Sequence, residues 1–156
     1  MGRPYKFIDT ISKCKLRNAS ILDLNALRKL EKESFEKDAW PLIDLIAVLT
    51  FPNVIRIKAT ENNQMIGFIA GDPRPNDGVG WVATIAVDSR FRLRGIGRAL
   101  LRACERELNL PHIKLTVRAS NQAAISLYEK EGYQTIDIWE RYYNDGESAL
   151  VMEKTL

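Results

Sequence analysis

The chain has 156 residues, of which 46% are hydrophobic and 28% charged, and its formal net charge at pH 7 is +3. This length and composition fit one soluble globular domain, and so small a net charge gives no reason to expect a nucleic-acid partner. The two cysteines, Cys14 and Cys104, have no metal-ligand or redox spacing, and the only histidine, His112, follows Pro111 in an expected loop. Histidine-based metal sites and Ser-His-Asp triads are therefore not expected, and reduced thiols favour a cytoplasmic protein.

The first half of the chain predicts a strand, two helices and a hairpin. Ser20 and Asp23 form a capping-box pattern that predicts a helix to about Lys37 with an apolar face, and Pro41 is typical of the first turn of a second helix. Alternating apolar residues predict strands over 15–20, 54–60 and 65–72, with a turn between the last two.

The second half predicts strands and helices in alternation. After a loop at 73–78, strands are expected over 81–87, 113–117, 133–143 and 147–155, the last two as a hairpin around Asn-Asp-Gly. One helix is expected to end at about Leu108, and another runs from a cap at Ser120 or Asn121 to Gly132. We expect one domain over 1–156, with 1–13 as an N-terminal extension and 14–156 as the core. No apolar run is long enough for a signal peptide or a membrane span, so no membrane partner is expected.

Segment 90–101, RFRLRGIGRALL, places two glycines among arginines at the expected start of a helix. Glycine lets backbone N–H groups approach a phosphate closely, a helix N-terminus favours an anion, and arginine adds forked donors. A Rossmann fingerprint would need a third glycine where Leu100 stands, and no P-loop motif is present. The segment therefore predicts an anion site, with a tight turn into a helix with a solvated basic face as the alternative.

The spacing R-x-x-G-x-G, at Arg92, Gly95 and Gly97 after the strand TIAV, resembles the acetyl-CoA signature of the GNAT acetyltransferase superfamily. The resemblance covers roughly residues 15–154. It implies an α/β domain with a mixed, mostly antiparallel, twisted sheet of about six to seven strands and about four helices. It also implies acetyl-CoA as cosubstrate and no metal. The cofactor contacts that it implies are Ile85, Ala86, Val87, Arg92, Leu93, Arg94, Gly95, Ile96, Gly97, Arg98 and Asn121.

Further motifs resemble RimI-type and archaeal protein N-terminal acetyltransferases, of the ribosomal-protein-alanine kind. RASNQAAISLYEKEGY resembles the motif whose tyrosine, here Tyr128, lies near the sulfur of the cofactor. ERYYNDGESALVM resembles a final hairpin in which a tyrosine pair, here Tyr142 and Tyr143, holds the start of a substrate protein. FEKDAWP resembles the loop that walls the same site and contains Trp40.

The general base departs from this pattern. RimI-type enzymes have L-E-V-R before the asparagine motif, whereas this chain has LTVR, with Thr116 in place of the glutamate. A threonine hydroxyl does not take a proton at neutral pH, although it can orient a water. Asp38 roughly matches the place where archaeal-type enzymes carry an acidic residue, so it is the alternative base.

The resemblance implies an N-acetyltransferase that transfers acetyl directly to a free amine, most simply the N-terminal α-amine of a protein. At pH 7 about one α-amine in seven is neutral, a deficit of about 1 kcal/mol, whereas a lysine amine needs about 4–5 kcal/mol. A weak base site therefore favours an α-amine. The alternatives are a small amine, such as a polyamine or an antibiotic, and a non-catalytic acyl-CoA sensor. Either a monomer or a homodimer is compatible with the sequence. Tyr128 as a plain core residue and Asp38 as a solvated carboxylate also stay open.

Overall fold

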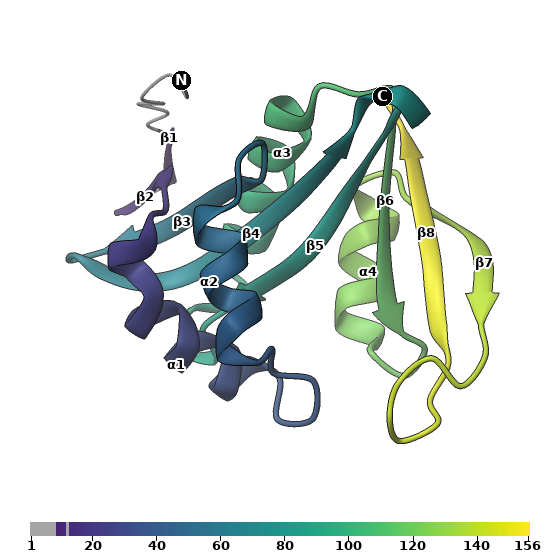
Figure 1. The fold of residues 1–156 in the computed structure, drawn as a ribbon, viewed down its shortest axis with the longest axis horizontal. Helices are drawn as coiled ribbons and strands as arrows, with labels where there is room; N and C mark the ends of the chain where they lie inside the picture. Colours follow the sequence, from purple (N-terminus) through teal and green to yellow (C-terminus); the bar gives the residue numbers. More distant parts are fainter. Residues whose placement is uncertain (1–8, 12) are drawn as a thin grey trace.

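A computed structural model of the chain describes residues 9–11 and 13–156 and shows an eight-stranded sheet with helices on both faces (Figure 1). The order of the strands is β1-β2-β3-β4-β5-β6-β8-β7. The strands are β1 Asp9–Ile11, β2 Cys14–Asn18, β3 Ile55–Glu61, β4 Gln64–Arg74, β5 Val79–Val87, β6 His112–Arg118, β7 Gln134–Trp139 and β8 Ala149–Thr155. The helices are α1 Leu24–Ser34, α2 Leu42–Thr50, α3 Ile96–Leu108 and α4 Gln122–Lys130, with 3-10 turns at Ile21–Asp23, Pro75–Asp77 and Ser89–Phe91.

The predicted fold class is confirmed, with one strand more than expected. All pairs of neighbouring strands are antiparallel except β5 with β6, and four α-helices accompany the sheet. The additional strand is β1, which pairs with β2 from Asp9↔Leu16 to Ile11↔Cys14 at the edge of the sheet. The predicted N-terminal extension, 1–13, otherwise lies outside the described residues except for Lys13.

Local capping signals placed the helix starts correctly. Ser20 and Asp23 form the predicted capping box, although they cap a 3-10 turn that leads into α1. Pro41 is the N-cap of α2, and Asn121 caps α4 by accepting a hydrogen bond from Ala124 N–H. These residues satisfy or replace backbone N–H groups that a helix start leaves unpaired, so their effect is local and can be predicted from sequence.

Several predicted boundaries were wrong: β4 extends to Arg74 in the expected loop, β5 begins at Val79 and β8 at Ala149. The first helix ends at Ser34 instead of about Lys37, because Phe35 leaves the helical conformation and its ring packs with the core beneath α1. Strand β7 ends at Trp139, short of the predicted 143, since Arg141 has a φ of 51°, which a strand cannot accommodate. His112 is not in a loop: it is the first residue of β6 and pairs with Val79.

Two apolar cores lie on opposite faces of the sheet. Helices α1 and α2 cover one face through a cluster that includes Leu27, Leu30 and Leu45, and this cluster contacts Phe68 and Ala86. Helices α3 and α4 cover the other face, where a larger cluster is centred on residues such as Leu100, Leu101 and Ile113. Helix α3 lies close against the strands, since a Cβ on Gly71 would come within 2.8 Å of the Cys104 sulfur.

Candidate active site

Strands β5 and β6 separate after a short paired stretch, and this opening organises the site. They pair only from Val79↔His112 to Trp81↔Lys114, and Figure 1 shows them diverging beyond that point. A bulge at Ala83 accompanies the separation, because Val82 pairs with Gly71 while Thr84 pairs with Ala70. We call the region between 82–87 of β5 and 115–118 of β6 the split. On the side facing the split, the backbone of 82–87 makes no ladder bonds with β6.

The glycine segment leads from the end of β5 into α3, as predicted. Gly95 is the N-cap of α3, with a φ of 81° and no side-chain cap, so the first N–H groups of this 13-residue helix are left for another acceptor. A Cβ on Gly95 would meet nothing within 4 Å. Leu93 also has a positive φ, 63°, and its side chain is fully exposed. These features fit a phosphate cradle, in which backbone strain is retained to aim donors at an anion.

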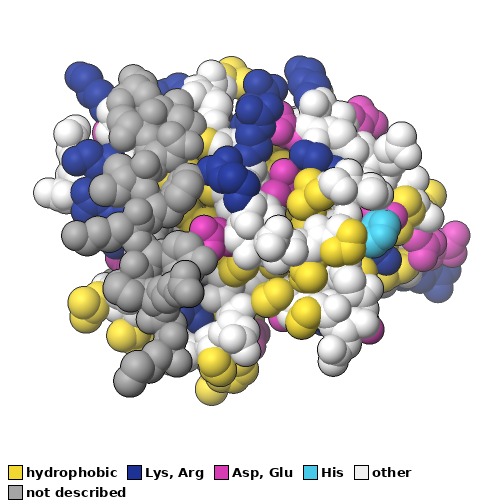
Figure 2. Space-filling model, turned by 90° about the horizontal axis from the view of Figure 1, so that it is seen from above, with side chains coloured by type: hydrophobic (Ala, Val, Ile, Leu, Met, Phe, Trp, Pro, Cys, Tyr) yellow, Lys and Arg dark blue, Asp and Glu magenta, His cyan; other side chains and the backbone are white. Residues whose placement is uncertain are grey.

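The arginines of this segment differ in their partners. Arg94 forms an ion pair with Glu61 at 2.8 Å, and Arg98 forms one with Glu131 at 2.7 Å. Arg92 instead donates from Nε to the Val87 carbonyl oxygen at 3.4 Å. The ion pairs are partly exposed, so their net stabilising effect is small. Figure 2 shows basic and acidic side chains next to one another on the face that it draws.

Substitution of Gly95 tests the cradle. Gly95→Glu places a strained backbone and a negative charge where the phosphates would lie, so the Kd for acetyl-CoA should rise at least about tenfold, measured by calorimetry. Gly146→Glu is the matched control: Gly146 has a φ of 88° and equally open space, but it lies in the loop between β7 and β8. An equal loss of acetyl-CoA affinity in both variants would mean general destabilisation and would contradict the assignment.

The predicted tyrosines and Thr116 are brought together at the split. Tyr128, on α4, is 5% exposed, and burial raises its pKa, with a further contribution from the neighbouring Tyr143. Tyr143 shares a side-chain hydrogen bond with Thr116, and burial raises its pKa while that bond acts against the rise. Tyr142 packs edge-on against Tyr143, with ring centroids 5.0 Å apart. The site thus contains a buried phenol that stays protonated at neutral pH, next to two further hydroxyls.

Arg118 at the end of β6 ties three separate segments together. Its Nε and one terminal nitrogen donate to the two oxygens of Asp38 at 2.6 and 2.7 Å. Its other terminal nitrogen donates to Asp145 and Glu147, and its guanidinium lies 4.1 Å above the Tyr143 ring. Both oxygens of Asp38 are therefore engaged by the guanidinium of Arg118.

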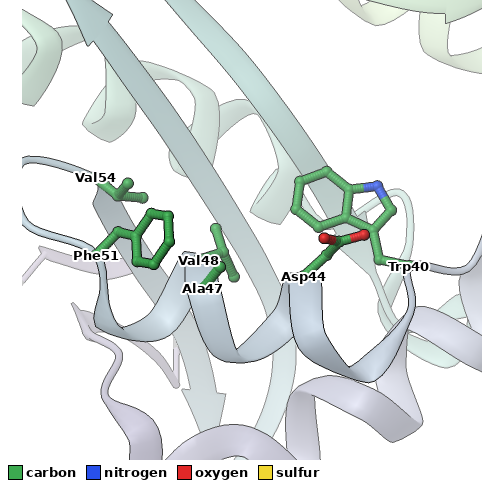
Figure 3. Close-up of a pocket in the computed structure, with 6 residues that line it drawn as sticks. All are labelled: Trp40, Asp44, Ala47, Val48, Phe51 and Val54. Carbon is green, nitrogen blue, oxygen red and sulfur yellow. The ribbon is translucent and has the colours of Figure 1, made fainter.

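Trp40 lies at one end of an apolar pocket of about 280 Å³ along α2. Figure 3 shows the Trp40 indole beside the Asp44 carboxylate at this end and Phe51 with Val54 at the other. A second aromatic group stands on the C-terminal strands, where Trp139 contacts both Trp81, at 6.1 Å, and Tyr142, at 5.4 Å. Both groups are available to hold an apolar or peptide substrate.

The remaining predicted cofactor residues lie on β5 and α4. Ile85 and Val87 face the α3–α4 core, whereas Ala86 faces α1 and α2. The side-chain oxygen of the exposed Asn121 is used as a helix cap, which leaves its amide nitrogen free to act as a donor. Within residues 9–11 and 13–156, no three His, Cys, Asp or Glu side chains are placed to share a metal ion. In the same residues, no helix has the length and apolar content needed to cross a bilayer.

Sequence reasoning missed the Glu31 carboxyl, which is the least exposed charged group in the structure's described part. Glu31 is 1% exposed, and its Oε1 accepts a hydrogen bond from the Thr84 hydroxyl at 3.0 Å. Burial raises its pKa to about 7, and the Thr84 bond only partly opposes this. A sequence signal existed, since Glu31 is four residues after Leu27 and so shares the apolar face of α1.

Comparisons with known proteins identify the family of the chain. Residues 24–133 match the model of the acetyltransferase (GNAT) family. The chain is 33% identical to an uncharacterized N-acetyltransferase of Methanocaldococcus jannaschii, over 89% of this chain and 90% of that protein. It is 29% identical to an N-alpha-acetyltransferase of Sulfurisphaera tokodaii, over 91% and 93%. The crystal structure of the ribosomal-protein-S18-alanine N-acetyltransferase from Escherichia coli superposes with a TM-score of 0.82, at 28% identity over 91% and 93% of the two chains. The motifs, the split sheet and these matches together establish that the chain belongs to the acetyltransferase (GNAT) family.

Proposed function

We propose that this acetyltransferase uses acetyl-CoA and acetylates the N-terminal α-amine of a protein or peptide. The observation that carries the proposal is the cluster at the split, where Tyr128 and Tyr143 approach each other and Tyr143 bonds Thr116. The names of the Sulfurisphaera and Escherichia relatives point to the same class of acceptor.

The residues divide into a cofactor side and an amine side. The start of α3 at Gly95 would hold the pyrophosphate of acetyl-CoA, and the backbone N–H groups of Ile85–Val87 that face the split would polarise the acetyl carbonyl. The Tyr128 hydroxyl would protonate the leaving thiolate. Tyr142 and Tyr143 would hold the first residues of the substrate, and Trp40 would contribute from the loop before α2.

An α-amine suits this site better than a lysine amine. Thr116 is not a base, and both oxygens of Asp38 are already occupied by hydrogen bonds from Arg118, so an amine that is already partly neutral is favoured. Because an α-amine titrates near 7.8 and a lysine amine near 10.4, a weak base handicaps lysine by roughly 3–4 kcal/mol more. The value of kcat/KM should therefore rise with pH up to about 8, where the α-amine loses its own proton.

A peptide panel tests the proposal. One peptide has a free N-terminus and no lysine, a second has a blocked N-terminus and an internal lysine, and a polyamine serves as the small amine. Thiol release from acetyl-CoA gives the rate, and mass spectrometry of the product gives the acetylated position. We expect the first peptide to be acetylated fastest, at its α-amine. Faster reaction of the lysine peptide or the polyamine would contradict the substrate class, and acetyl-CoA binding without any thiol release would indicate a sensor.

A further inference from the structure

Each strand that borders the split carries a threonine, and the hydroxyl of one of them, Thr84, donates to the buried carboxylate of Glu31. Lys114, Thr116 and Arg118 alternate with the core residues Leu115 and Val117, so they project from the face that carries α1 and α2. Arg118 confirms this direction, since it reaches Asp38 in the loop after α1.

Thr84 projects from the same face on the other side of the split. Its hydroxyl donates to Glu31 of α1, and the bulge at Ala83 is what turns this side chain toward α1 while Val82 joins the opposite core. Each strand that borders the split thus presents one threonine to the face that carries α1 and α2, Thr84 from β5 and Thr116 from β6. Thr84 also immediately precedes Ile85, the first of the residues proposed to polarise the acetyl group.

The surroundings of the Glu31 carboxyl favour the exchange of a proton at this group. Its Oε2 is buried and has no hydrogen-bond partner among the described residues, and the same holds for the hydroxyl of Ser34 one turn later on the helix. The elements that pack on α1 are α2, β4, β5 and the 3-10 turn Ile21–Asp23. Their charged side chains are Asp44 on α2, Asp72 with Arg74 at the end of β4, and Asp23 in the turn. None of them contributes to the raised pKa of Glu31, which comes from burial.

We propose that Glu31 takes up the proton lost by the attacking amine, through the hydroxyl of Thr84. The proposal rests on the proposed function, because it supplies a proton acceptor for the same reaction, as an alternative to Asp38. Thr84 Oγ1 accepts a proton from the amine while its own proton moves to Glu31 Oε1. As this happens, the bond from nitrogen to the acetyl carbon forms, the carbon–sulfur bond breaks, and Tyr128 protonates the thiolate. After the products leave, Glu31 loses its proton to solvent and Tyr128 regains one, so both groups return to their starting states.

A carboxyl that titrates near 7 is well matched to this task. It is ionised in a useful fraction of molecules at neutral pH, and its affinity for a proton is close to that of an α-amine. Thr84 is the catalytic residue of the pair, because it meets the amine, and Glu31 is the positioning residue that makes the hydroxyl basic.

Four variants test the relay on the fastest acceptor of the wild-type protein. Glu31→Gln keeps an acceptor for Thr84 but cannot take a proton, and Thr84→Val removes the hydroxyl at constant shape. Both should lower kcat at pH 7 on the order of 10²-fold with little change in the Kd for acetyl-CoA. Thr84→Ser retains the hydroxyl and should retain most of the activity. Glu33→Gln, on the exposed side of α1, should behave as wild type. The double variant Glu31→Gln, Thr84→Val should be no slower than either single one, since members of one relay act as a unit.

Two readouts separate a relay from a merely structural contact. The acid limb of the pH profile should lose its component near pH 7 in Glu31→Gln and keep only the ionisation of the amine. Without any cofactor, an infrared titration of wild type against Glu31→Gln should show a protonated carboxyl with a midpoint near 7.

An unchanged kcat and acid limb in Glu31→Gln, or a midpoint near 4.5, would overturn the proposal. Equal losses of kcat in Thr84→Val and Thr84→Ser would also overturn it. This comparison tests the relay even if Glu31→Gln does not fold. If a small amine is the fastest acceptor, the peptide assignment fails while the relay is judged on that amine. If no amine is acetylated, both fail.

Discussion

Tyr128→Phe should lower kcat by about 10²–10⁴-fold while the Kd for acetyl-CoA stays nearly unchanged. The substitution removes one hydroxyl from a ring that is 5% exposed, so the packing of α4 is preserved. A general acid contributes roughly this factor, and the raised pKa of Tyr128 keeps its proton in place throughout the neutral range. The measurement is a single-turnover rate with saturating acetyl-CoA, so that product release does not hide the chemical step.

Tyr133→Phe is the matched control for this experiment. Tyr133 is equally buried, its ring centroid is 5.9 Å from that of Tyr128, and its hydroxyl donates to Glu105 at 2.8 Å on the far side of the core. Its loss should cost about 1 kcal/mol of stability and leave kcat intact. If Tyr128→Phe has the same profile as Tyr133→Phe, Tyr128 is a core residue and the leaving thiolate obtains its proton elsewhere.

Glu31→Gln should make the folded protein more stable, by about 2 kcal/mol at pH 8. The pKa of Glu31 is raised by burial from 4.5 to about 7, so the folded state binds its proton more tightly than the unfolded state does. The free energy of unfolding of the wild-type protein therefore falls relative to that of Glu31→Gln as pH rises from about 4.5 to about 7. Above that range the difference between the two proteins is constant. Below pH 4.5 both states of the wild type are protonated and the two proteins should unfold alike. Urea unfolding at pH 4.5, 6 and 8 measures this difference.

Glu105→Gln provides the opposite case. Glu105 is also buried, but its carboxylate is bonded by Lys154 at 3.0 Å and by Tyr133. Removing this charge leaves Lys154 without its partner, so the variant should be less stable at pH 8 than wild type. A gain in stability at Glu31 together with a loss of turnover is the combination expected of a group kept for function. A loss of stability at both sites would show that Glu31 is an ordinary structural carboxylate.

Local patterns made most of the fold predictable from the sequence. Capping at Ser20 and Asn121, proline at position 41 and the alternation in β3, β4 and β6 each depend on residues close in the chain. The glycine segment was equally accessible, because the turn, the helix start and the arginines are contiguous. The end of β7 was not, since nothing near Arg141 indicates a positive φ in place of a continued strand.

The missed parts of the site depend on contacts between distant segments. Arg118 engages Asp38 from 80 residues away and Asp145 from 27. Thr84 meets Glu31 across 53 residues, and only because a bulge redirects its side chain. No periodicity reveals such contacts. Only Glu31 could have been identified from nearby residues, because a carboxylate on the apolar face of an amphipathic helix is unusual and indicates a specific role.

The short pairing of β5 with β6 joins the two parts of the sheet by few backbone hydrogen bonds. Three residue pairs join a half made of β1 to β5 to a half made of β6, β8 and β7. Partial unfolding separates a protein where the fewest interactions must be broken, here between β5 and β6. Native-state hydrogen exchange should therefore divide the backbone amides into two groups with different protection, one for each part of the sheet. A molecule bound in the split contacts both parts of the sheet and opposes their separation. Its arrival should therefore slow exchange in strands that it never touches, most of all in β6 and β8, which have no other strand partner toward the larger half.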